Sequence, residues 1–284
     1  CNSLTVGQGT SGVLRFVGTT NLAMTINTNL SVSAGASYTV LNNATHSLNL
    51  KGNLLNNGSV NFRPTAARLC NINFTKNGNA TLSGTGTTNM YNLITLNMGT
   101  SISNTLDVTA SNFTVQPDFL VLTNGTFKLS TVNAVSITPY SGISTINNTS
   151  GITINSAAAT VNFGNTINLY GNLIVNNGIV NIGNAQNENV VSNGGVFQIF
   201  GGTVTVAGQY YSTNINTLAK FTISGGTLTL PTVGCTSTTI APFHIDGAGS
   251  TFNMSGGTII IQREGGTGTQ DLGYTAINIT NSSV

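Results

Sequence analysis

FQIFGGTVTV, residues 197–206, is the first of three segments that align with one another without a gap. The other two are FTISGGTLTL at residues 221–230 and FNMSGGTIII at residues 252–261. On both sides of the central GGT, apolar residues alternate with polar ones at the two-residue period of a β-strand. The first glycines, Gly201, Gly225 and Gly256, stand 24 and 31 residues apart. The segments therefore form a repeat whose period is irregular.

Related units extend this pattern through most of the chain. LNLKGNL at residues 48–54 resembles INLYGNL at residues 167–173. A shorter unit, in which apolar residues follow a glycine at alternate positions, recurs from Gly12, Gly58, Gly125, Gly178, Gly195, Gly202, Gly226 and Gly257. No window has the i, i+3, i+4, i+7 apolar spacing of an amphipathic helix. The sequence therefore predicts a chain that is nearly all β.

A single repeat unit cannot bury its apolar side, whereas stacked units can. If successive units pair edge to edge at about 4.8 Å per turn, their inward Phe, Ile, Val and Leu side chains form one core. Corner glycines adopt positive φ without steric cost, and asparagines at turns can hydrogen-bond along the stack. We therefore predict a right-handed parallel β-helix (β-solenoid) that occupies residues 1–284 as one segment. We expect about 20 to 30 residues per turn and about ten turns.

Tandem antiparallel β-sandwich modules are the alternative fold. The Asn-Gly pairs that begin at Asn57, Asn124 and Asn177 are strong signals for two-residue hairpins. Against this alternative, sandwich edges are normally protected by charges and prolines, and this chain has five prolines and only 5% charged residues. It also lacks the tryptophan that marks many tandem sandwich modules. The solenoid is the interpretation that we favour.

The composition argues against several classes of partner. The net charge of +2 comes from scattered residues, and no basic run suggests nucleic-acid binding. Apolar runs are short, far from the roughly 20 residues of a membrane-spanning helix. We therefore expect no nucleic-acid partner, no membrane insertion and no cofactor.

The three cysteines, Cys1, Cys70 and Cys235, have no metal-binding spacing. A Cys70–Cys235 disulfide is one interpretation, and buried single thiols are the one that we prefer. Cys1 would carry a lipid in a processed lipoprotein, but strand-like alternation from Leu4 leaves almost no tether. We expect Cys1 to be unmodified and both ends of the chain to be cut from a longer protein.

Three segments are similar to those of a known group of proteins: NSLTV at residues 2–6, LKGNLLNNG at 50–58 and LSGTGTTNMYNL at 82–93. They resemble the Asn/Thr/Gly-rich β-helical repeats of very large Bacteroidota surface proteins, which include gliding-motility adhesins exported by the type IX secretion system. The resemblance implies export by that secretion machinery and an extracellular position on the outer cell surface. It also implies adhesion to substrata or polysaccharide, and contacts with other parts of the same giant protein.

The densest group of ionisable residues is His244, Asp246, Arg263, Glu264 and Asp271. Stacking could bring Asp246 near Glu264, as in β-helical polysaccharide lyases or glycosidases, which need paired carboxylates. His244 and Asp246 share one face of a strand, however, so we prefer a structural ion pair and expect no catalytic residue. A Ca²⁺ site made by His244, Asp246, Glu264 and Asp271 is a further hypothesis, although the close-spaced oxygen ligands of a dedicated loop are absent.

Two aromatic residues are candidates for carbohydrate binding. Tyr210 and Tyr211 are adjacent, so in a strand they point to opposite faces and at least one should lie outside. His46, between Thr45 and Ser47, is expected to be a surface residue.

We therefore expect a non-enzymatic surface adhesin or stalk whose stiff rod presents repeated weak contacts. A β-helical polysaccharide-degrading enzyme is the alternative. Ice binding by arrays of threonine ranks third, because only Thr203/Thr205 and Thr227/Thr229 approach the required outward pattern.

Overall fold

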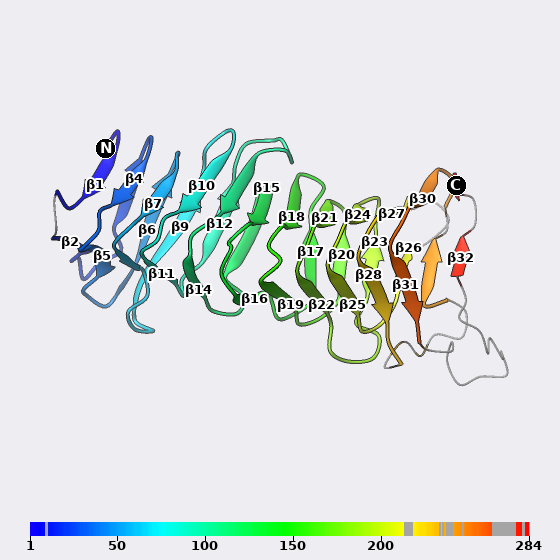
Figure 1. The fold of residues 1–284 in the computed structure, drawn as a ribbon. Helices are drawn as coiled ribbons and strands as arrows, with labels where there is room; N and C mark the ends of the chain where they lie inside the picture. Colours follow the sequence, from blue (N-terminus) through cyan, green and yellow to red (C-terminus); the bar gives the residue numbers. More distant parts are fainter. Residues whose placement is uncertain are drawn as a thin grey trace. The chain divides into compact units, whose positions relative to one another are not determined.

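The computed structural model describes residues 1–8, 11–212, 218–232, 234, 236, 241–245, 247–262, 277–279 and 282–283. Within these residues the chain is all β without a helix, and its strands pair in parallel as a β-solenoid of about nine turns (Figure 1). The chain divides into two compact units, unit 1 (Cys1–Ile137) and unit 2 (Thr138–Val284). The predicted parallel solenoid is confirmed for both units.

Unit 1 has three faces of parallel strands. The first face contains, in spatial order, β1 (Leu4–Val6), β4 (Leu30–Val32), β7 (Leu54–Asn56), β10 (Ala80–Ser83), β13 (Thr105–Val108) and β15 (Leu120–Leu129). The second contains β2 (Gly12–Phe16), β5 (Ala36–Val40), β8 (Ser59–Asn61), β11 (Thr87–Met90) and β14 (Asn112–Val115). The third contains β3 (Ala23–Ile26), β6 (Ala44–Leu50), β9 (Arg68–Phe74), β12 (Ile94–Asn97) and the beginning of β15. β15 passes from the third face to the first at Gly125, whose φ is 95°.

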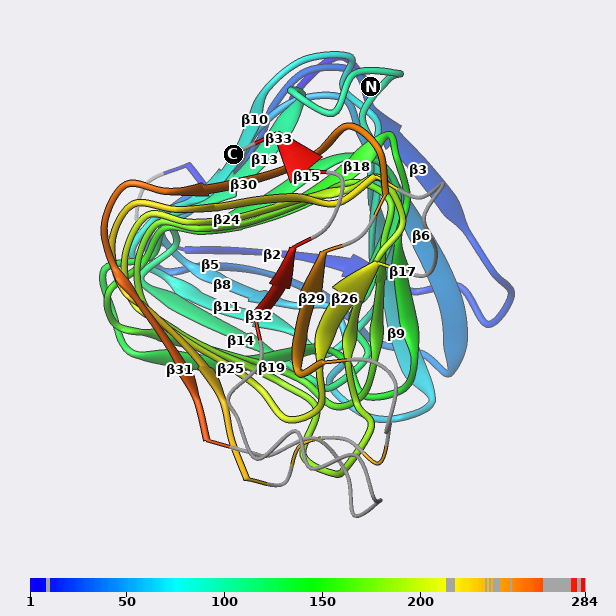
Figure 2. The same cartoon turned by 90° about the vertical axis from the view of Figure 1, so that its right-hand side faces the viewer.

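Unit 2 is built in the same way, and Figure 2 shows its three faces around the interior. The first face contains β18 (Ser150–Ile154), β21 (Asn172–Val175), β24 (Val196–Ile199), β27 (Lys220–Ile223), β30 (Ser250–Met254) and β33 (Ser282–Ser283). The second contains β16 (Val135–Tyr140), which begins in unit 1, β19 (Ala159–Phe163), β22 (Ile179–Ile182), β25 (Thr203–Val206), β28 (Thr227–Leu230) and β31 (Thr258–Ile261). The third contains β17 (Ser144–Ile146), β20 (Ile167–Leu169), β23 (Val190–Ser192), β26 (Tyr210–Ser212), β29 (Phe243–Ile245) and β32 (Ile277–Ile279).

The strand register matches the alignment of the three repeats. Phe197 lies opposite Phe221, and Phe221 lies opposite Phe252, although the two spacings along the chain differ. Strand pairs between consecutive turns are parallel, and the one isolated antiparallel bridge among the described residues joins Thr65 and Arg68. The antiparallel sandwich alternative is therefore wrong. The Asn-Gly pairs that suggested hairpins lie instead at corners or, for Gly125, at a bend within β15.

Glycine is required where the first face of unit 2 turns into the second. Gly178, Gly202, Gly226 and Gly257 occupy equivalent corners with φ between 71° and 89°, a region that other residues rarely adopt. A Cβ atom on Gly226 would lie 2.5 Å from the carbonyl oxygen of Gly202, far inside van der Waals contact. That same carbonyl accepts a 3.0 Å hydrogen bond from the Thr227 amide. Close approach and backbone conformation together explain why the second glycine of GGT recurs.

Phenylalanines from two of the repeats and from β29 pack together in the core of unit 2. The Phe197, Phe221 and Phe243 side chains are fully buried. Phe221 lies 5.6 Å from Phe197 and 5.0 Å from Phe243 between ring centroids, in both cases edge to face. Burial of each such ring contributes about 1.5–3 kcal/mol, and an aromatic pair adds about 0.5–1.5 kcal/mol. Packing of neighbouring turns therefore supplies the burial that one turn lacks.

Asparagine amides link consecutive turns, as predicted, although some of them belong to strands rather than turns. In each linked pair one side-chain amide donates to the side-chain oxygen of the other, at 2.8–3.2 Å. The pairs are Asn49 with Asn73, Asn77 with Asn104, Asn97 with Asn124, Asn155 with Asn176, and Asn162 with Asn181. Each bond ties one turn to the next through side chains on the outside of the stack.

His46 is buried, so the expectation of a surface residue is wrong. Its side chain is 1% exposed, and its imidazole lies 4.9 Å from the Phe16 ring with the planes inclined by 13°. Its Nδ1 accepts a 3.1 Å hydrogen bond from the Leu22 amide. Thr45 and Ser47 face outward on the same strand, so the polar flanks concealed an inward position.

Cys70 lies opposite His46 in the β6–β9 register and is a fully buried free thiol. Burial raises the pKa of this thiol far above its ordinary value. The preferred interpretation of a buried single thiol is therefore confirmed for Cys70, whereas Cys235 lies outside the described residues.

Candidate functional site

Hydroxyl and amide side chains are aligned on the outer side of the second face of unit 2. One aligned set, termed the amide row, consists of Asn162, Asn181, Thr205 and Thr229, which face one another on consecutive strands β19, β22, β25 and β28. All four side chains are half-buried, and the strand residues on either side of each are buried. Asn181 Nδ2 donates a 2.9 Å hydrogen bond to Asn162 Oδ1. The row is therefore ordered along the stacking direction and points outward.

A second aligned set lies two residues earlier on these four strands and continues onto β31. It consists of Thr160, Ile179, Thr203, Thr227 and Thr258. The threonines are interrupted at Ile179, whose side chain is 47% exposed. The regular outward threonine pair that ice binding requires is thus absent from the β22 turn, where Ile179 and Asn181 stand.

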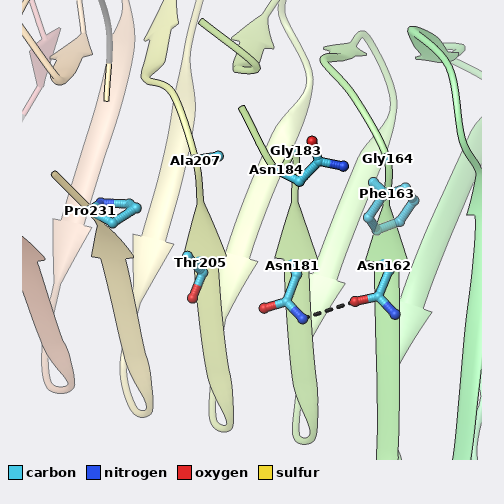
Figure 3. Close-up of a pocket in the computed structure, with 9 residues that line it drawn as sticks. All are labelled: Asn162, Phe163, Gly164, Asn181, Gly183, Asn184, Thr205, Ala207 and Pro231. Atoms are coloured by element: carbon cyan, nitrogen blue, oxygen red, sulfur yellow. Dashed lines mark hydrogen bonds between the residues drawn. The ribbon is translucent and has the colours of Figure 1, made fainter. Parts of the chain in front are cut away.

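An open pocket of about 470 Å³ lies over the amide row at the carboxyl ends of the strands (Figure 3). Its lining consists of Asn162, Phe163, Gly164, Asn181, Gly183, Asn184, Thr205, Ala207 and Pro231. These residues come from four consecutive turns, so the pocket crosses the strands. None of the nine lining residues is charged. The pocket is therefore uncharged: the amide and hydroxyl groups of Asn162, Asn181 and Thr205 lie on its floor, most of the surface around them is apolar, and Pro231 forms an apolar wall.

The loop that follows β22 holds one side of this pocket. It begins at Gly183, whose φ is 75°. The Glu188 carboxylate accepts hydrogen bonds from the backbone amides of Asn184 and Ala185 through its Oε2 atom. A single acidic side chain thereby fixes the loop conformation.

The two tyrosines predicted to bind carbohydrate lie on opposite sides of β26. Tyr210 is fully buried, with its ring 5.2 Å from that of Phe243, and is therefore a core residue. Tyr211 faces outward and is half-buried, opposite Val191 on one side and His244 on the other. Burial raises the pKa of both phenols. The expectation that at least one of the pair lies outside is confirmed, and Tyr211 is the one that can reach a ligand.

The ionisable cluster near the carboxyl terminus is described only at His244. This side chain is half-buried on β29. Asp246, Arg263, Glu264 and Asp271 lie outside the described residues, so the ion pair and the Ca²⁺ site stay predictions. Among the described residues, no group of three or more His, Cys, Asp or Glu side chains could hold a metal ion.

Sequence reasoning missed the pocket although a signal was present. TVNFG at residues 160–164 and IVNIG at residues 179–183 share an asparagine between two apolar residues and a following glycine. The shared pattern places Asn162 and Asn181 on one outward row. The loop wall could not be inferred, because it depends on the hydrogen bonds made by Glu188.

Comparisons with known proteins found no match to this chain among family models, curated proteins or solved structures. The part of the chain that the structure describes has no helix suited to crossing a membrane.

Proposed function

We propose that this chain is a segment of an extracellular adhesin or stalk, displayed on the outer cell surface, whose outer faces contact polysaccharide. The observation that carries the proposal is the alignment of hydroxyl and amide side chains on consecutive turns, typified by the amide row. Such side chains complement sugar hydroxyls, which both donate and accept hydrogen bonds. The resemblance to Bacteroidota surface proteins supports the same role and adds the secretion machinery and other parts of a giant protein as partners.

The fold suits a segment that transmits mechanical force. Within each unit, main-chain hydrogen bonds and aligned side chains join every described turn to the next, as between Phe197, Phe221 and Phe252. A stack held in this way resists bending, because bending would separate paired strands and the side chains packed between them. Buried aromatic contacts between turns add to this resistance.

Adhesion in this proposal depends on many weak contacts rather than one deep pocket. The amide row supplies one amide or hydroxyl side chain per turn over four consecutive turns. A polymer that touches several of these turns gains effective concentration at each further contact. The outer surface carries few charges, so we expect the binding to depend weakly on salt.

The purified chain, attached to beads, tests the proposal. We expect the beads to be retained under flow on at least one polysaccharide-coated surface, and retention to fall when the soluble form of that polysaccharide is added. Beads that carry the urea-unfolded chain serve as the control. No retention on any of a broad set of neutral and acidic polysaccharides would contradict the proposal, as would release of soluble sugar by the chain, which indicates an enzyme.

A further inference from the structure

We infer that the pocket over the amide row binds a single extended chain of a neutral β-1,4-linked glycan, aligned across the strands. This inference rests on the proposed function and names the ligand class and the site within it. It is argued from the direction of the pocket, the spacing of its polar groups, its charge and its wall.

The direction in which the glycan would run follows from the order of the lining residues. Asn162, Asn181, Thr205 and Pro231 belong to four consecutive turns, and the first three are aligned in register (Figure 3). A ligand that touches all four must run perpendicular to the strands, along the stacking direction. A compact ligand, such as one monosaccharide, would leave part of this lining unoccupied.

The distance between neighbouring strands favours a straight polymer that places one sugar ring over each turn. Neighbouring strands lie about 4.8 Å apart, which is close to the length of one pyranose ring in an extended β-1,4-linked chain. Such a chain stays straight, so its successive rings can meet Asn162, Asn181 and Thr205 in turn. α-1,4- and β-1,3-linked chains coil, and they would leave the row after one or two rings.

The polar floor and the apolar wall of the pocket match the two kinds of surface on a β-1,4-linked glycan. A β-1,4-linked glycan is a ribbon with hydroxyl groups along both edges and C–H groups on its faces. The amide and hydroxyl groups of Asn181 and Thr205 can hydrogen-bond one edge, whereas Pro231 can pack against a face. Alternate rings are inverted, but both edges carry hydroxyls, so the contacts persist at each turn.

The absence of charge from the lining favours neutral sugars. None of the nine lining residues is acidic or basic, and Glu188 uses its carboxylate on the backbone of the adjoining loop. A uronic acid in this pocket would lose water around its carboxylate without gaining a cationic partner. Acidic glycans should therefore bind more weakly than neutral ones.

The orientation of Asn181 supports a site formed before the ligand arrives. Its Nδ2 atom is engaged with Asn162 Oδ1, which fixes the plane of the amide. A fixed amide loses little conformational entropy on binding, whereas a freely rotating side chain would lose about 0.5–1.5 kcal/mol.

Titration of the full 284-residue chain with hexasaccharides tests the inference. We expect cellohexaose or chitohexaose to bind, with affinity that rises with length up to about four rings, and maltohexaose and laminarihexaose to bind at least tenfold more weakly. Thr205→Val keeps the side-chain shape and should reduce affinity severalfold, and Asn181→Leu should reduce it about tenfold, as expected for one or two lost hydrogen bonds. Thr222→Val, on the outer side of the first face of unit 2, is the matched control and should bind normally.

The outcomes separate this inference from the proposed function. Equal binding of coiled and straight glycans, or unchanged affinity in Thr205→Val, overturns the inference while retention of beads on polysaccharide still supports an adhesin. If no polysaccharide retains the beads, both proposals fail. Thermal unfolding of each variant shows whether a loss of binding comes from the site, and Thr205→Val decides the result if Asn181→Leu does not fold.

Discussion

The His46 imidazole packs face to face with the Phe16 ring in the interior of unit 1, at a centroid distance of 4.9 Å. Burial lowers the pKa of His46 below its ordinary value of 6.5. The folded chain therefore binds a proton less tightly than the unfolded chain. The contribution of neutral His46 to the free energy of unfolding is fully present above the ordinary pKa of about 6.5. It is lost as the pH falls below that value, because the unfolded state then takes up more protons than the folded state.

We accordingly expect the urea midpoint of the wild-type chain to be lower at pH 5 than at pH 7.5. In His46→Phe the ring contact with Phe16 can persist but the titrating group is gone, so its midpoint should depend less on pH. A midpoint that falls equally in both proteins would show that other groups govern the acid response.

Gly226→Ala should destabilise the chain by about 2–4 kcal/mol, from positive φ and a steric clash. Its Cβ would approach the Gly202 carbonyl oxygen to 2.5 Å at a φ of 71°. Gly142→Ala is the matched control, since a Cβ there meets nothing within 4 Å. Urea titration measures both, and a similar small effect in the two variants would contradict the close-packed corner.

Phe221→Ala should cost about 3–5 kcal/mol, because it opens a cavity between three stacked turns. Phe200→Ala, in the same unit, removes a ring that is 45% exposed and should cost far less. The difference between the two variants in the free energy of unfolding tests whether the aligned repeat is a core. Equal losses of stability in the two variants would contradict the placement of Phe221 in the core and of Phe200 at the surface.

The Asn49–Asn73 hydrogen bond, 2.8 Å long, should contribute about 0.5–1.5 kcal/mol. A double-mutant cycle with Asn49→Ala and Asn73→Ala isolates this term, since each single change removes the same bond. We expect the two effects to be less than additive. Strict additivity would mean that the amides of neighbouring turns act independently.

Cys70 should resist alkylation in the folded protein, because burial both shields its thiol and raises its pKa. In a Cys235→Ser background, iodoacetamide should modify the exposed Cys1 readily and Cys70 only after unfolding in urea. Mass spectrometry of peptides reports each site. Modification of Cys70 at the rate of Cys1 without urea would contradict its buried position.

Local patterns were sufficient to predict the parallel stack and much of its core. The alignment of the three GGT segments anticipated the pairing of Phe221 with Phe197 and with Phe252, since inward rows must match for burial to continue. His46 was predicted wrongly because a polar residue between two polar neighbours gives no sign of its direction. Its place is set by the register of β6 with β9, which is a long-range property.

The candidate site was less predictable for a related reason. Alternation placed Tyr210 and Tyr211 on opposite faces but could not say which was inside, and packing against Phe243 decides it. The pocket combines residues from four turns, so it exists only once the turns are stacked.

The segment between Phe221 and Phe252 is longer than the one between Phe197 and Phe221, yet both pairs keep the same alignment. The length of a connection is thus uncoupled from the lattice of paired strands. A gene encoding such a chain can therefore acquire or lose codons between two aligned phenylalanines without shifting the rows on either side.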